Sequence, residues 1–331
     1  SNLGNFYAKL MLGHSMQDLF NILNNQTGLL FSSVFILGLL IGSFLNVVIF
    51  RIPKMLEQDW HLQCAHLLED EKRIEELESK QKITLSTPNS NCPSCQHAIK
   101  PWENIPVISY LFLKGKCSQC KSAISLRYPA VELATAILSL VVILYFGASY
   151  EGLAGLMLTW VLISLTLIDA DTQLLPDNMT LPLLWLGLML NAFGMFTSLE
   201  SALWGAVFGY LSLWSVYQLF KLLTGKEGMG YGDFKLLAAL GAWFGWQSLP
   251  IIILVSSLVG AAIGISMIII KGKDKYIDSE IFDFVENLSE VSDITIIKKV
   301  IKNKKFLNLL KLALFFERTN SIQHIIASTG I

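Results

Sequence analysis

Charged side chains are scarce in this sequence of 331 residues, because Asp, Glu, Lys and Arg together make up only 15% of it. A typical soluble domain is about 25% charged, whereas hydrophobic residues here reach 53%. Too few ionic groups are present to cover the surface of a soluble protein of this size. The formal net charge of -1 also excludes the concentrated basic face that a nucleic-acid partner normally needs. The composition therefore indicates a membrane protein.

Histidine is also rare, and its positions exclude one class of active site. The five histidines lie outside every apolar stretch, at His14, His61, His66, His97 and His324. A Ser-His-Asp arrangement within a membrane-embedded site is therefore not available. No glycine-rich nucleotide-binding loop follows a strand pattern, which excludes a soluble Rossmann methyltransferase.

Long apolar stretches dominate the rest of the chain. A bilayer-spanning helix needs about 20 mostly apolar residues, and seven stretches are candidates: Leu29–Ile49, Val131–Ala148, Leu153–Ile168, Met179–Phe196, Ala202–Leu222, Phe234–Trp246 and Ile251–Ile270. The shortest of them is Phe234–Trp246. We predict an all-α polytopic membrane protein of about seven transmembrane helices with a small cytoplasmic loop domain.

The charged residues divide the chain into segments. The expected organisation is an N-terminal segment 1–28, a first transmembrane helix 29–50, a polar loop 51–128, a six-helix membrane region 129–273 and a polar tail 274–331. Residues 1–15 resemble vector sequence, and residues 65–82 read as an amphipathic, solvated helix. Alternate connections carry the basic residues, among them Arg51, Lys54, Lys221, Lys226, Lys271, Lys273 and Lys275. The positive-inside rule places these connections, and the polar loop, in the cytoplasm.

Two Cys-X-X-Cys pairs lie in the polar loop. Cys92 and Cys95 form one pair and Cys117 and Cys120 the other, each in a turn-forming context. Two such turns present four thiolates to one tetrahedral ion, which predicts a structural zinc site; a redox pair or unligated thiols are the alternatives. Cys64 lies outside this spacing and reads as a free buried thiol, and His97 as a surface residue.

Acidic residues at the ends of two apolar stretches are the candidates for catalysis. Asp169 and Asp171 close one stretch and are followed by Asp177, and Asp233 opens another after Gly230 and Gly232. Acids at membrane depth point to function. Two carboxylates that share a proton can act as general base and general acid on a peptide bond. Helix caps in a transporter or a scaffold are the alternative reading of the same residues.

The motifs together resemble bacterial type IV prepilin leader peptidases, which are GxGD membrane aspartyl proteases. The resemblance covers the chain from about Leu29 to Lys273 and rests on five ordered motifs: Gly42-Ser-Phe-Leu-Asn46 with Arg51-Ile-Pro53, the two cysteine pairs, Arg127-Tyr-Pro129 with Glu132, Asp169 with Leu-Leu-Pro-Asp177, and Gly228-Met-Gly-Tyr-Gly-Asp233-Phe-Lys235.

The resemblance implies catalytic aspartates at Asp169 and Asp233. Asp169 is chosen over Asp171 because it lies eight residues before Asp177, as in the family. The remaining motif residues would support the catalytic loops: Asp171, Asp177, Gly230, Gly232 and Lys235.

The resemblance also implies substrates and a second activity. Members cleave the basic leader of type IV prepilins and type II secretion pseudopilins after a glycine, at the cytoplasmic face of the bacterial inner membrane. Many also methylate the new N-terminal residue with S-adenosylmethionine. No methyl-donor residue is assigned, although the zinc loop and Glu132 are candidates. After Lys273 the chain departs from the family pattern, which continues with a last transmembrane helix.

A polytopic transporter that uses Asp169 and Asp233 to relay protons or bind cations is the competing hypothesis, and a non-catalytic membrane scaffold is the third. Against the transporter hypothesis, this sequence lacks charged residues deeper inside the spans, where the midplane site of a transporter is expected.

Overall fold

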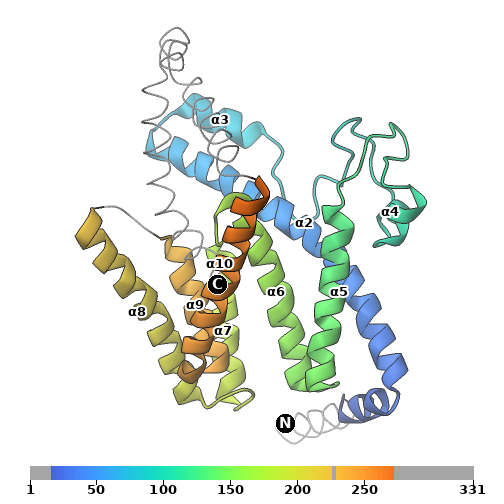
Figure 1. Ribbon diagram of the computed structural model, residues 1–331. Coiled ribbons are helices and arrows are strands. Elements are labelled where there is room, and N and C mark those ends of the chain that lie inside the picture. The colour runs from blue at the N-terminus through green and yellow to red at the C-terminus, as the bar shows by residue number, and fades with distance from the viewer. Residues whose placement is uncertain (1–15, 226–228, 272–331) are drawn as a thin grey trace, which may run out of the picture. The chain divides into compact units, whose positions relative to one another are not determined.

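The computed structural model describes residues 16–225 and 229–271, and helices are the main regular elements of this part (Figure 1). The predicted segments 1–15 and 274–331 lie outside these residues, as does Gly228. Residues 16–25 are helical. The further elements are α2 (Thr27–Leu67), α3 (Glu71–Ser79), η1 (Pro101–Asn104), α4 (Ile108–Phe112), α5 (Arg127–Phe146), α6 (Tyr150–Thr172), α7 (Asp177–Ala192), α8 (Leu199–Thr224), α9 (Tyr231–Phe244), η2 (Trp246–Ser248) and α10 (Leu249–Lys271).

The predicted all-α membrane class is confirmed, but seven spans is more than the structure supports. Among the described residues, four helices are long and apolar enough to cross a bilayer alone: α2, α5, α6 and α8. A fifth span results if α9 and the following residues 246–262, bent by 118°, are counted as one broken span. The hydropathy pattern does not show where a helix ends within an apolar stretch. For this reason it predicted spans at α7 and α9, which have only 16 and 14 residues and are shorter than a bilayer requires.

The chain divides into two compact units, Ser1–Met179 and Thr180–Ile331. In the first unit, α2 continues without interruption past the predicted end of its apolar stretch and contains Pro53. The helix expected over residues 65–82 is two helices instead. Glu69 adopts a φ of 53° between them, and the Asp70 side chain accepts from the Arg73 N–H and so begins α3.

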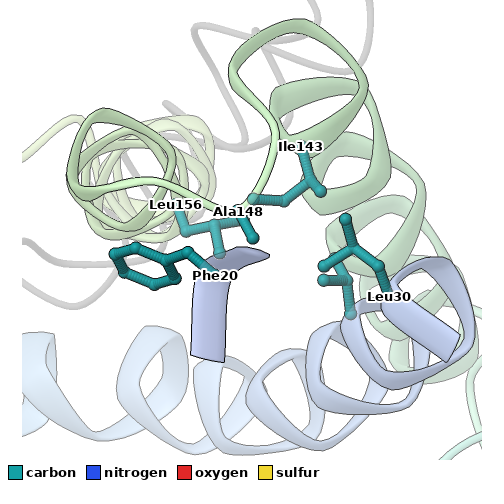
Figure 2. Close-up of a cluster of buried hydrophobic side chains, with 6 residues drawn as sticks. Phe20, Leu30, Ile143, Ala148 and Leu156 are labelled. Carbon is teal, nitrogen blue, oxygen red and sulfur yellow. The ribbon is translucent and has the colours of Figure 1, made fainter. Parts of the chain in front are cut away.

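Small residues allow α2 and α5 to pack closely. A Cβ on Gly38 would lie 2.6 Å from the Cα of Ala136, and one on Gly42 would lie 2.7 Å from the Cα of Glu132. At the other end of these helices, Phe20, Leu30, Ile143, Ala148 and Leu156 form a buried apolar cluster with Val34 (Figure 2). The cluster contains residues of α2, α5 and α6, and each of these helices contacts the other two.

The second unit is built on α8 and α9, which touch through glycine. A Cβ on Gly205 would collide with the carbonyl of Gly241, and one on Gly209 would lie 2.6 Å from the carbonyl oxygen of Leu237. The buried Asn191 side chain connects the end of α7 to α9: its amide nitrogen donates to the carbonyls of Ala242 and Trp243 at 2.8 and 2.9 Å. Its oxygen accepts from the backbone N–H groups of two residues that follow α7, Phe196 and Thr197.

Candidate active site and metal centre

The four predicted cysteine ligands lie together. All four Sγ atoms are within 4.8 Å of one another. The distance between Cys92 Sγ and Cys120 Sγ is 3.8 Å, and that between Cys95 Sγ and Cys117 Sγ is 4.0 Å. Because each short distance joins the two pairs, both turns contribute to one cluster that can hold a metal ion.

The two cysteine turns are built alike. In each, the N–H of the first cysteine donates to a carbonyl five residues later, His97 at 2.9 Å or Ser122 at 2.8 Å. The chain then returns through a residue with positive φ, which is 58° at Gln96 and 62° at Lys121. Isolated β-bridges close both turns, Asn91 with Ala98 and Lys116 with Ala123. Each turn therefore presents two sulfurs on the same side, as a four-sulfur site requires.

Hydrogen bonds favour thiolates at some of these sulfurs but not at all of them. The N–H groups of Cys95 and Ser94 and the Ser122 hydroxyl lower the pKa of Cys92 to about 6. The His97 N–H acts in the same direction on Cys95, but desolvation and the neighbouring sulfurs outweigh it and raise the pKa of Cys95 to about 12. Four sulfurs this close repel one another when all are ionised, and a bound cation removes that penalty.

Glu103 connects the two turns. Its carboxylate accepts from the Lys100 N–H at 2.9 Å and lies 3.3 Å from Nε2 of His97. These groups, with a hydrogen bond from the Ser118 side chain, lower the pKa of Glu103 to about 2. His97 is therefore not a plain surface residue: its side chain is 20% exposed and serves the metal centre indirectly. The expected burial of Cys64 is wrong, because this thiol is exposed near the end of α2.

Asp169 and Asp171 lie in the last turn of α6. Asp169 is half-buried, and its carbonyl accepts from the N–H of Gln173, which ends the helix with a φ of 53°. Asp171 is exposed and accepts two hydrogen bonds from the guanidinium of Arg127, at 2.7 and 2.6 Å. Asp177 follows in the first turn of α7.

Asp233 lies in the first turn of α9, and Gly230 is the residue before that helix. The Asp233 side chain is buried, and the positive end of the helix dipole favours a carboxylate at this position. Phe234 is fully buried, and its ring contacts those of Tyr210, Tyr217 and Tyr231. Gly232 and Lys235 lie half-buried in the same turn and the next. Asp233 belongs to the second unit and Asp169 to the first.

Two charged residues of α2 and α5 have structural partners that the sequence did not reveal. Arg51, interpreted as a topology marker and as part of the first motif, is 8% exposed and donates to the carbonyls of Thr84 and Pro88 at 2.9 and 2.6 Å. Glu132 is buried and accepts from the N–H of Val107 at 2.7 Å. One N–H therefore fixes the orientation of this carboxylate inside the fold. Ionic residues at positions that helix periodicity buries are the signal that would have found both.

Family models match most of the chain. The bacterial peptidase A24 N-terminal domain matches residues 36–146, which include the four cysteines, and the type IV leader peptidase family matches residues 156–265, which include Asp169 and Asp233. No solved structure matches the chain.

Curated relatives cover a similar part of the chain. A prepilin leader peptidase/N-methyltransferase of Pseudomonas aeruginosa is 61% identical over 233 residues, which are 70% of this chain and 79% of the relative. Proteins of the same name from Aeromonas salmonicida and Neisseria gonorrhoeae are 55% and 53% identical, over 73% and 72% of this chain and 83% and 82% of their own lengths. With its apolar helices, the chain is a bacterial membrane protein, and it belongs to the type IV leader peptidase family.

Proposed function

We propose that this protein removes the leader peptide of type IV prepilins, with Asp169 and Asp233 as the catalytic carboxylates. The main support for this proposal is that the part of the chain matched by the leader peptidase family contains both acids. Asp169 lies in the last turn of α6 and Asp233 in the first turn of α9. Acids are costly to place at membrane depth unless they have a function. The relatives' names support the substrate class, and the same chemistry extends to type II secretion pseudopilins.

The reaction is a peptide hydrolysis in which the two acids have different protonation states. The ionised carboxylate accepts a proton from water, whose oxygen attacks the scissile carbonyl carbon, while the protonated carboxyl donates to the carbonyl oxygen. The C–N bond then breaks and its nitrogen takes up a proton. The products are a leader with a new carboxylate and a pilin with a new N-terminal amine.

The membrane arrangement supports cleavage at the cytoplasmic face of the inner membrane. The substrate's basic leader lies in water and its apolar helix in lipid, so the scissile bond lies at the membrane edge. The position of Asp169, three residues from the end of the apolar helix α6, supports this depth. Local support for the two acids comes from Asp171, Asp177, Gly230, Gly232 and Lys235.

N-methylation of the new amine is the second activity that we propose, from the relatives' names. Bound S-adenosylmethionine would supply an electrophilic methyl group for that amine. No residue of its site is assigned.

Zinc is the ion that we propose for the cysteine cluster. A tetrahedral site with Zn–S bonds of about 2.3 Å has sulfur–sulfur edges of about 3.8 Å. The inter-pair distances of 3.8 and 4.0 Å support this size. Four sulfur ligands leave no position for water, which supports a structural ion.

Leader cleavage by purified variants in detergent tests the aspartate pair. Asp169→Asn and Asp233→Asn should each lower the cleavage rate by about 10²-fold or more. Glu200→Gln is the matched control, because Glu200 is an exposed acid in the first turn of α8, and it should cleave like the unmodified protein. Cleavage retained by either aspartate variant would remove that residue from the mechanism and leave the transporter reading open.

A further inference from the structure

The connection between the two cysteine turns carries large apolar side chains on its outside. Within Pro101–Phe112, here called the interfacial segment, Trp102 is 64% exposed, Leu111 68% and Phe112 84%. Ile105 and Ile108 are exposed as well. Outside a membrane span, apolar side chains gathered in this way indicate a contact with another apolar phase or partner.

A part-buried hydrogen bond ties the interfacial segment to the start of α5. The Val107 N–H, directly before α4, donates to the Glu132 carboxylate at 2.7 Å. Glu132 lies five residues into α5, which is about 7.5 Å along the helix axis from Arg127. Figure 1 shows α4 beside this end of α5. The segment is therefore placed no farther from the bilayer than the first turn of a membrane-spanning helix.

The charges around the segment favour lipid headgroups over a second protein. Between residues 100 and 127 there are five basic residues and one acidic residue, Glu103, which is held by His97 and Lys100. The Lys100 ammonium lies 5.4 Å from the Trp102 ring centre. Tryptophan with flanking lysine is typical of side chains at the membrane–water interface, and lysines close to that interface attract anionic lipids.

We propose that the interfacial segment lies in the membrane–water interface, with Trp102, Leu111 and Phe112 inserted among lipid headgroups and acyl chains. The interfacial segment thereby anchors the metal centre to the membrane surface, in addition to the hydrogen bond between Val107 and Glu132. This contact does not depend on peptidase activity, so it can be tested separately from the proposed catalytic pair.

A matched control is present in the same chain. Leu67 and Leu68 are 84% and 77% exposed, as open as Phe112 and Leu111, but they lie at the C-terminal end of α2. That position is 16 residues after Arg51, or about 24 Å along the helix axis. The exposed fractions of the two pairs are thus similar, while their expected distances from the membrane differ.

Lipid photo-crosslinking of the full-length protein in vesicles tests the proposal. The probe is phosphatidylcholine with a diazirine on its acyl chain, added to vesicles of phosphatidylcholine alone or of phosphatidylethanolamine and phosphatidylglycerol. Mass spectrometry should find adducts on the interfacial segment at the yield of outward-facing α5 residues such as Leu144, and only background on Leu67 and Leu68. The phosphatidylglycerol vesicles should give the higher yield on the segment.

Paired variants keep the test independent of folding. The double variant Leu111→Ser and Phe112→Ser should lower adduct formation at Trp102, while Leu67→Ser with Leu68→Ser should not, and both should retain bound metal. Background yield on the segment in both vesicle types overturns the proposal. Adducts lost on addition of a prepilin, or replaced by cross-links between two copies of the chain, overturn it in favour of that occupant.

Discussion

The two terminal guanidinium nitrogens of Arg127 each donate to one oxygen of the Asp171 carboxylate, at 2.7 and 2.6 Å. Arg127 begins α5, directly after the second cysteine turn, and Asp171 lies two residues after Asp169 in the last turn of α6. The bidentate geometry fixes orientation as well as distance. The pair therefore ties the helix end that carries Asp169 to the chain that leaves the metal centre.

Breaking this pair should affect catalysis more than stability. Both side chains are more than a third exposed, and an ion pair of that kind contributes about 0–1 kcal/mol. Arg127→Gln should leave the unfolding temperature nearly unchanged but lower kcat for leader cleavage about tenfold, with a smaller effect on KM, because the Asp169 turn loses its orientation. Steady-state cleavage assays and thermal unfolding measure the two effects.

The charge reversal Arg127→Asp with Asp171→Arg should recover part of the lost kcat, whereas either single reversal should not. Arg73→Gln, at an exposed site on α3, is the control. Equal kcat in Arg127→Gln and the unmodified protein would show that the pair does not position Asp169.

Metal binding should depend on the four clustered cysteines and not on the fifth. Cys92→Ser removes a ligand whose Sγ lies 3.8 Å from that of Cys120, and zinc measured by mass spectrometry of the purified protein should fall from about one ion per chain to well below one. Cys64→Ser, at an exposed thiol, should keep the full content. An unchanged zinc content in Cys92→Ser would refute the assignment.

Glu103 should make the stability of the loop depend on acid pH. Its pKa is lowered from 4.5 to about 2 by hydrogen bonds from Lys100, Ser118 and His97. Because the folded pKa is the lower one, the stabilisation is fully present above pH 4.5 and is lost as the pH falls toward 2. The difference in unfolding temperature between the unmodified protein and Glu103→Gln should therefore shrink below pH 4.5.

An exposed acid provides the comparison for this pH series. Lys80 lowers the pKa of Glu76, but Glu76 is solvent-exposed, so screening makes the pair weak. Glu76→Gln should unfold at the same temperature as the unmodified protein at every pH. A difference for Glu103→Gln that stays constant from pH 6 to 3 would contradict the assigned role of the carboxylate.

Asn191 should be a stability determinant of the second unit. Its side chain is 1% exposed and makes four hydrogen bonds to the backbone. Asn191→Leu leaves buried N–H and carbonyl groups without this partner, at a cost of about 2–4 kcal/mol in the free energy of unfolding. Asn191→Asp keeps the two acceptor contacts but places a carboxylate against two carbonyls, and it should also be destabilising.

Denaturant unfolding in detergent measures the loss. Asn178→Ala, at an exposed position near the start of α7, should change the free energy of unfolding by less than about 0.5 kcal/mol. Equal stability of the Asn178 and Asn191 variants would show that α7 is held by other contacts.

Local patterns in the sequence determined the helical membrane class, the cysteine cluster and the positions of Asp169 and Asp233 at the ends of apolar helices. These features depend on hydropathy, on the spacing within each Cys-X-X-Cys pair and on acids beside apolar runs, all of which lie within a few residues. The preference of a four-sulfur site for zinc then depends on the type and number of its ligands and not on the surrounding fold.

Tertiary structure alone decided where apolar runs break and which charged side chains are used inside the fold. The Asn191 side chain connects the end of α7 to residues up to 52 positions away, and Gly245, with a φ of 81°, ends α9. Arg51, Glu132 and Arg127 find partners 33, 25 and 44 residues distant. No window of hydropathy contains such pairs, because a hydrogen bond depends on where two segments meet in space and not on the residues beside either one.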